Sequence, residues 1–181
     1  QPLERGSTKT FVVNSVEHSY IPEAMDLTAF DQLPKSGLID DFSHGLTNWG
    51  YARKGALQTY KFQNPELDTT PGKRLAITLG LKPGQELLLR LDLNGKYNDP
   101  DIEIGKFHYE RNVSGNGPQI ILLEAKDFKK ERSKKENNKP LEWSKITAFA
   151  ITLTDTKTKR KINLASPGGT EVLRRIELVN P

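Results

Sequence analysis

The sequence predicts an all-β protein, an antiparallel β-sandwich or barrel. Three observations lead to this fold class. Within short segments, apolar and polar residues alternate with the two-residue period of a half-buried strand. Turns rich in glycine and proline separate these segments. No stretch keeps a 3.6-residue period for more than about two helical turns, so a helical fold is disfavoured.

Residues 1–36 differ from the rest of the 181-residue chain. Prolines at positions 2, 22 and 34 interrupt this segment, which offers one short strand at residues 11–13. We interpret it as a leader or interdomain connector. The start of the sequence has no signal-peptide apolar region, so either a signal was removed or the chain is a fragment. The β-rich domain is expected to cover residues 37–181.

The first strands of this domain are separated by polar turns. Threonine, proline, glycine and asparagine supply the turn formers. In the third strand Tyr60 and Phe62 alternate with polar neighbours. The expected strands lie at residues 38–42, 49–51 and 58–62, with turns at residues 43–48 and 68–73.

Two leucine-rich strands follow, at residues 75–81 and 86–93, with a Lys-Pro-Gly turn at residues 82–84 between them. In the second strand the leucines at positions 87, 89, 91 and 93 point to one side, whereas Arg90 and Asp92 point to the other. This segment has the clearest alternation in the protein.

The C-terminal half centres on residues 127–153. An Asp-Phe turn and a lysine-rich loop lead to apolar anchors and to a strand at residues 148–153, which together supply Leu141, Trp143, Ile146, Phe149, Ile151 and Leu153. The other strands of this half are expected at residues 101–109, 119–124, 160–164 and 173–179, with turns or loops at residues 114–118 and 166–169.

The formal net charge of +4 is equalled by one segment, residues 129–139, which holds five lysines, one arginine and two glutamates. Such a run is either a solvated loop or a landing patch for a polyanion such as a sulfated or uronic glycan. It lacks the interleaved aromatic residues that stack on bases, which argues against nucleic acid. No apolar stretch approaches the ~20 residues that cross a bilayer, so no membrane partner is expected.

Sequence motifs of catalysis are missing. There is no cysteine, no nucleophile elbow and no phosphate-binding glycine loop. The three histidines, His18, His44 and His108, lie on different expected elements, which disfavours a shared metal site. The chain is therefore expected not to be an enzyme.

Aromatic and planar polar residues gather on the strands and adjacent loops of the first two-thirds of the chain. Sugar-binding sites use flat aromatic faces against C–H patches and planar polar groups for the hydroxyls. For Trp49 and Trp143 the alternative is a structural role at the ends of the sandwich. The candidate ligand-binding residues are Trp49, Tyr51, Arg53, Tyr60, Tyr97, Asn98, His108, Tyr109 and Arg111.

Three short motifs give the chain a resemblance to the galactose-binding-like β-sandwich, a jelly-roll group that includes carbohydrate-binding modules of bacterial polysaccharide-degrading enzymes. The motifs are Ile39-Asp40-Asp41-Phe42 followed by Trp49, Lys126-Asp127-Phe128 followed by Trp143-Ser144-Lys145-Ile146, and Leu173-Arg174-Arg175-Ile176-Glu177-Leu178. The resemblance implies a jelly-roll topology. It also implies a structural Ca²⁺ between the first and last strands, held by Asp40 or Asp41 and by Glu177.

The leading functional hypothesis is a non-catalytic carbohydrate-binding module. It would bind a polysaccharide or oligosaccharide and target an attached or associated enzyme, such as a catalytic domain in the same full-length chain, to that substrate. A secreted location, extracellular or periplasmic, goes with this function. The alternative is a protein-interaction or structural β-sandwich, in which the same aromatic residues form an interface.

Overall fold

The computed structural model describes residues 9–13, 16–20, 35–52, 55–96, 103–131, 140–166 and 168–181. It divides the chain into two compact units, residues 1–34 and 35–181. The first unit contains an antiparallel hairpin of β1 (Lys9–Val13) and β2 (Val16–Tyr20). None of the helices in the described part of the chain is long and apolar enough to cross a membrane.

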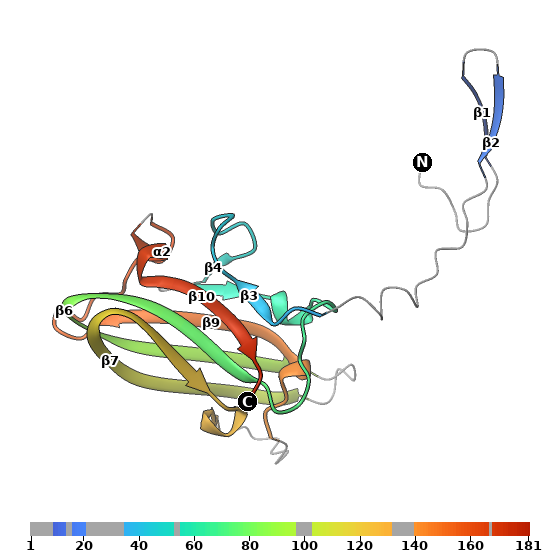
Figure 1. Cartoon of the computed structure of the whole chain (residues 1–181). Coiled ribbons are helices and arrows are strands. Elements are labelled where there is room, and N and C mark those ends of the chain that lie inside the picture. The colour runs from blue at the N-terminus through green and yellow to red at the C-terminus, as the bar shows by residue number, and fades with distance from the viewer. Residues whose placement is uncertain are drawn as a thin grey trace. The chain divides into compact units, whose positions relative to one another are not determined.

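Within the described part of the second unit, the strands form one antiparallel sheet (Figure 1). They are β3 (Leu38–Asp40), β4 (Gly50–Ala52), β5 (Ala56–Thr59), β6 (Arg74–Lys96), β7 (Glu103–Leu123), β8 (Lys129–Lys130), β9 (Ile146–Asp155) and β10 (Leu173–Val179). Short helices punctuate the connections: η2 (Lys61–Gln63), η3 (Ala125–Asp127), η4 (Trp143–Lys145) and α2 (Gly169–Val172). The predicted all-β class is confirmed.

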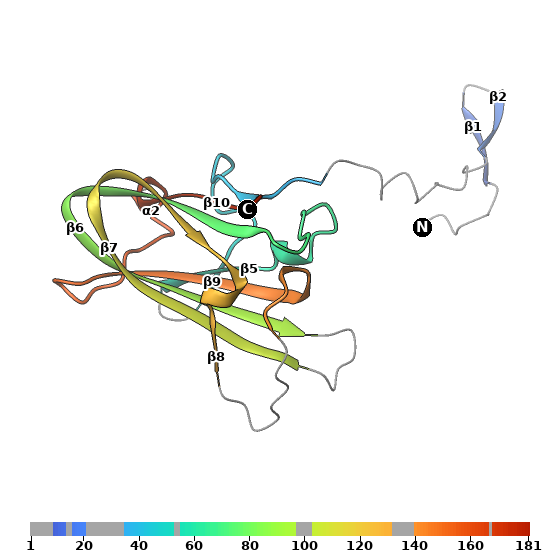
Figure 2. The ribbon, with the colours of Figure 1, turned by 60° about the horizontal axis from the view of Figure 1, so that its bottom comes forward.

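The long hairpin β6–β7 runs through both layers of the sandwich. The first part of β6 pairs with β10, from Leu75 opposite Leu178 to Leu79 opposite Leu173, and β3 lies beyond β10. The second part pairs with β9, and β5 and β4 follow in that layer. Strand β7 accompanies β6 along both parts. One curled sheet therefore makes both faces of the sandwich, as Figure 2 shows from another side.

The two strands bend together at the predicted Lys-Pro-Gly turn. Gly84 has a φ of 70°, and the pairing with β7 shifts register between Leu81 and Gln85. Opposite Leu81, Gly117 has a φ of 87°. Glycine adopts this left-handed backbone without a Cβ clash, and a register shift bends a strand locally. The prediction of two separate strands is wrong, because pairing with β7 carries β6 across the bend.

Three other local predictions differ from the structure. The expected strand at residues 58–62 ends at Thr59, and η2 follows, so Phe62 is buried while Tyr60 is exposed. Residues 160–164 form an isolated bridge, Thr154 opposite Lys161, in place of a strand. The expected loop at residues 114–118 lies inside β7. The strand at residues 58–62 ends early because η2 turns the chain, whereas pairing with β6 keeps residues 114–118 within β7.

The core lies between the layers and follows the alternation seen in the sequence. The side chains of β6 and β9 that were expected to face inward are all fully buried: Leu87, Leu89, Leu91, Leu93, Phe149, Ile151 and Leu153. From the other layer Leu75, Ile77 and Leu79 face them. Because these side chains cover both inner faces, their burial supplies the main drive for folding.

An aromatic chain crosses this core. Among the described residues its successive rings, with neighbouring centroids 5.6 to 6.4 Å apart, are Phe42, Trp49, Phe149, Phe62, Trp143, Phe128 and Tyr109. Stacked, tilted and edge-to-face pairs alternate along it, and such pairs add to the energy of burial alone. Both tryptophans of the sequence therefore pack in this chain, Trp143 buried and Trp49 partly buried against the core.

Candidate functional site

The structure places Trp49 against the core. Its ring stacks on Phe42 at 5.6 Å and meets Phe149 edge-on at 6.2 Å. The indole Nε1 donates a hydrogen bond to the Asp40 carboxylate at 2.7 Å. These contacts occupy both the ring and its only donor, so this arrangement favours the structural role of Trp49 over a stacking platform for sugar.

Strand β7 does not bring its three candidate residues to one site. Tyr109 is the inward partner of Leu91 and packs on Phe128, with the ring centroids 5.8 Å apart. Neighbouring strand residues face opposite sides, so His108 lies on the outer face. There its Nδ1 is 3.9 Å from the Glu131 carboxylate. Arg111 is exposed.

The remaining candidates divide between one exposed residue and residues without a described position. Tyr60 is 58% exposed, and its hydroxyl accepts a hydrogen bond from the Gln58 amide at 2.8 Å. Of Tyr51 only the backbone, in β4, is described. Arg53, Tyr97, Asn98 and most of the basic segment at residues 129–139 lie outside the described residues.

The three carboxylates expected to bind calcium are each bound to other groups. Asp40 is 8% exposed and accepts hydrogen bonds from Trp49 and Lys61. Asp41 accepts bonds from the hydroxyl and amide of Ser43, which lower its pKa below the usual value. Glu177 pairs with Arg175 at 2.8 Å.

Strand geometry also separates these carboxylates. Asp40 lies opposite the fully buried Ile176 and faces the core, whereas Glu177 is one residue further along β10, on its outer side. Among the described residues no group of three or more histidines, aspartates or glutamates is placed to hold a metal ion. The calcium site stays a prediction of the resemblance.

One cleft among the described residues, the Trp143 cleft, has a volume of about 420 Å³. Turns at one end of the sandwich form it: the turn before β6, η3 after β7, η4 before β9, and the residue that follows Asn180. Trp143 reaches this end because its indole Nε1 donates to the Lys73 carbonyl at 2.7 Å. The lining residues are Thr69, Pro71, Gly72, Lys73, Arg74, Glu124, Ala125, Lys126, Leu141, Glu142, Trp143, Ser144 and Pro181.

This cleft combines an apolar floor with a charged rim. Leu141 and Trp143 are almost completely buried, so they present only an edge to it. On the rim the Lys126 ammonium lies 2.6 Å from the Glu124 carboxylate. That pairing raises the pKa of Lys126. The cleft can therefore receive a ligand that has both C–H surface and polar groups.

Asp68 and Lys73 stabilise the turn beside the Trp143 cleft. The ammonium lies 2.8 Å from the Asp68 carboxylate and also donates to the Asn180 side chain at 2.7 Å. The Lys73 ammonium, together with the hydroxyl of Thr70, holds the pKa of Asp68 well below its usual range.

We expect this pair to make stability depend on acid. Because the folded-state pKa of Asp68 is depressed, its contribution is fully present above the unfolded pKa of about 3.9 and is lost as the pH falls further, toward the folded value. Chemical denaturation from pH 6 to pH 2 should show the wild type more stable than Asp68→Asn at pH 6 and the difference shrinking below about pH 4. A difference that is constant with pH would contradict this assignment.

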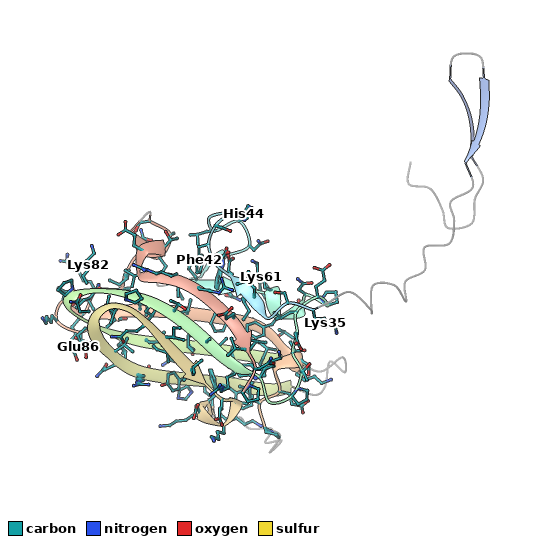
Figure 3. All side chains as sticks on the ribbon, in the orientation of Figure 1. Lys35, Phe42, His44, Lys61, Lys82 and Glu86 are labelled. Carbon is teal, nitrogen blue, oxygen red and sulfur yellow. The ribbon has the colours of Figure 1, made fainter. Side chains whose placement is uncertain are left out.

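A smaller and more polar cleft, the Asp40 cleft, has a volume of about 310 Å³. It lies between β3, the turn that follows it and η2, and Figure 3 shows Phe42, His44 and Lys61 in this region. Phe42 takes a φ of 59°, and its amide bonds to the Asp40 carboxylate at 2.8 Å, which starts the turn. The lining residues are Leu38, Ile39, Asp40, Asp41, Ser43, His44, Gly45, Asn48 and Lys61.

Sequence reasoning found few of the residues that line either cleft. It singled out Asp40 and Asp41, but as metal ligands, and Trp143, but as an anchor. Arg74 and Glu142 carry no local signal, because each is a common polar residue at or next to the start of an element. Their proximity depends on turns that are more than 60 residues apart in the chain. The basic residues of the Trp143 cleft could have been noted only as part of the overall positive charge.

The arrangement of the Trp143 cleft is suited to binding a small polar ligand or one end of a polymer. Searches of family models, of curated proteins and of solved structures find no match to this chain.

Proposed function

We propose that the 35–181 unit is a non-catalytic carbohydrate-binding domain that holds a polysaccharide or oligosaccharide in the Trp143 cleft. The observation that carries this proposal is the composition of the cleft, an apolar floor beneath a polar rim. Sugar rings present both C–H faces and hydroxyl groups, so they need both kinds of surface. The volume of about 420 Å³ also lies in the range of small-ligand sites.

The polar groups of the rim fit the hydroxyl groups of a sugar. The exposed Glu142 carboxylate forms no ion pair with a described residue and is an acceptor for two hydroxyls. Ser144 is exposed and adds a hydroxyl that donates or accepts. In a secreted protein such a domain would raise the local concentration of substrate around an attached catalytic domain.

Closing the cleft tests the proposal. Ser144→Tyr places a large side chain at an exposed position of the cleft wall. It should weaken binding to a polysaccharide that retards the wild type in a gel by about tenfold or more. Affinity gel electrophoresis against a panel of neutral and acidic polysaccharides measures this loss. The matched control, Ser114→Tyr, makes the same change at an exposed position of β7 that does not line the cleft, and should leave retardation unchanged.

Two outcomes of this experiment count against the proposal, and a third shows that the control has failed. Uniform mobility of the wild type with every polymer would remove glycan binding altogether. Equal retardation of the wild type and Ser144→Tyr would remove the Trp143 cleft as its location. Loss of retardation in both serine variants would point to a general effect on the fold, which the melting temperatures of the two variants would reveal.

A second candidate function, protein interaction, is favoured by one specific observation. Ile120 and Leu122 of β7 are 66% and 46% exposed, although both are large apolar residues. In this part of β7 the only neighbour among the described strands is β6. An open edge with apolar side chains is a surface for another chain. Sedimentation of wild type and Ile120→Lys separates the candidates: loss of an oligomer in the variant supports interaction, and a monomer in both does not.

A further inference from the structure

We infer that the Trp143 cleft recognises an anionic group of its glycan, a uronate carboxylate or a sulfate ester, through Arg74. This inference rests on the proposed function for the sugar, but the anion site is argued from Arg74 itself. Both groups present anionic oxygens to a guanidinium, in a planar arrangement for the carboxylate and in a tetrahedral one for the sulfate. The arms of the experiment below distinguish them.

Arg74 differs from the other cations that line the cleft. Lys73 is paired with Asp68 at 2.8 Å, and Lys126 is paired with Glu124 at 2.6 Å. No carboxylate of a described residue lies within 4.0 Å of the Arg74 guanidinium. Arg74 is therefore the cation of this cleft whose charge the described residues leave unpaired.

The hydrogen-bond donors of Arg74 are largely unused as well. A guanidinium has five N–H donors. The described residues accept one hydrogen bond from it, from Nη2 to the Asn180 carbonyl at 3.2 Å. Its Nε is shielded from solvent and has no hydrogen-bond partner. A buried donor without a partner costs free energy.

An oxyanion is the ligand that uses this arrangement best. Neighbouring N–H groups of arginine form a fork that matches two oxygens of a carboxylate or sulfate. The single bond to Asn180 orients the guanidinium at the start of β6 while leaving the other donors for a ligand. The half-buried position strengthens the attraction relative to a fully solvated arginine.

The rest of the cleft selects a sugar over other anions. Glu142 on the rim accepts hydrogen bonds from hydroxyl groups of the same sugar. A sugar with one anionic substituent and several hydroxyls satisfies Arg74 and Glu142 together.

Matched polymers test the inference. We expect the full chain to bind polygalacturonate at least about tenfold more tightly than its methyl ester, or dextran sulfate more tightly than dextran, because only the charged member reaches the Arg74 fork. The first pair detects a carboxylate and the second a sulfate. Equal affinity for the charged and neutral members of both pairs would overturn the inference while leaving glycan binding intact.

Substitutions separate Arg74 from general charge attraction. Arg74→Gln should weaken binding of the preferred acidic polymer about 10- to 100-fold, and Arg74→Lys, which keeps the charge but not the fork, should lose less. The control, Arg175→Gln, removes one positive charge from the neighbouring strand β10 and should change affinity less than about threefold. Equal losses in Arg74→Gln and Arg175→Gln would show a nonspecific charge effect and contradict the inference.

A measurement without polymer distinguishes this inference from the proposed function. Titration of the labelled chain with galacturonate or inorganic sulfate, followed by NMR, should shift the Arg74 Nε–Hε signal in a saturable manner and leave that of Arg175 in place. A saturable shift of the Arg74 signal, in a protein that binds none of the polymers, would support the anion site and reject the glycan module. No shift at Arg74 would reject the anion site, whether or not a polymer binds.

Discussion

Replacing Phe149 by alanine is expected to lower the free energy of unfolding of the 35–181 unit by about 4 kcal/mol. Phe149 is 0% exposed and is the third ring of the aromatic chain, between Trp49 and Phe62. Its ring is 6.2 Å from that of Trp49 and 5.6 Å from that of Phe62. Removing it loses the transfer energy of a buried ring and also leaves a cavity that both layers line.

Urea denaturation followed by far-UV circular dichroism measures this loss, and the melting temperature should fall by about 10 °C or more. Phe149→Leu is the control, because it keeps most of the volume and should cost less than about half as much. Similar stabilities for the alanine variant and the wild type would mean that Phe149 is not packed between the two layers. A large loss in the leucine variant would instead indicate that ring shape, beyond volume, is required.

The second large effect is expected from Asp40→Ala, at about 3 kcal/mol. The carboxylate accepts hydrogen bonds from the Trp49 indole at 2.7 Å and the Phe42 amide at 2.8 Å, and it pairs with Lys61 at 2.9 Å. The variant leaves these three donors without that acceptor. Lys61 is partly exposed and retains the Ile39 carbonyl at 2.9 Å, so solvent offsets part of the loss.

Two controls make this prediction specific. Asp41→Ala removes the adjacent, exposed carboxylate and should have a much smaller effect on the midpoint of denaturation. Asp40→Ala combined with Lys61→Met should be less destabilised than the sum of the single changes, because the second change removes the unpaired cation. Additive effects in this double-mutant cycle would contradict the pairing of Asp40 with Lys61.

The predictions that proved correct depend on local information. Alternation of side chains along a strand has a period of two residues, so Leu87, Leu89, Leu91 and Leu93 could be assigned to one buried face from the sequence. The burial of Trp143 beside a turn was likewise expected. Burial in a sheet follows from the local alternation once one face is covered, whichever partner covers it.

The predictions that failed depend on strand pairing. Lys82, Pro83 and Gly84 carry all the signs of a turn, yet β6 continues through them because β7 pairs with it on both sides of the bend. Tyr60 and Phe62 share an alternating pattern, but η2 turns the chain after Thr59. Turn residues specify a local change of direction and leave open whether the pairing of the two strands ends there.

The candidate site was the least predictable part. Aromatic residues are used both in sugar sites and in cores, and composition does not separate these uses. In the structure Trp49 and Tyr109 pack in the aromatic chain. The polar rim of the Trp143 cleft includes Arg74 and Glu142, whose local sequence is unremarkable.

The sequence by itself determined the all-β class, the inward face of the long strands and the apolar anchors, because these follow from the alternation of neighbouring side chains. Only the tertiary structure decided that β6 and β7 run through both layers and that the Trp49 indole donates to Asp40. It also decided that Arg74, Glu142 and Trp143 line the same cleft. The physical reason is how far apart in the sequence the interacting residues lie. Burial patterns are set by adjacent residues, whereas a cleft requires turns far apart in the chain to be brought together by the pairing of strands.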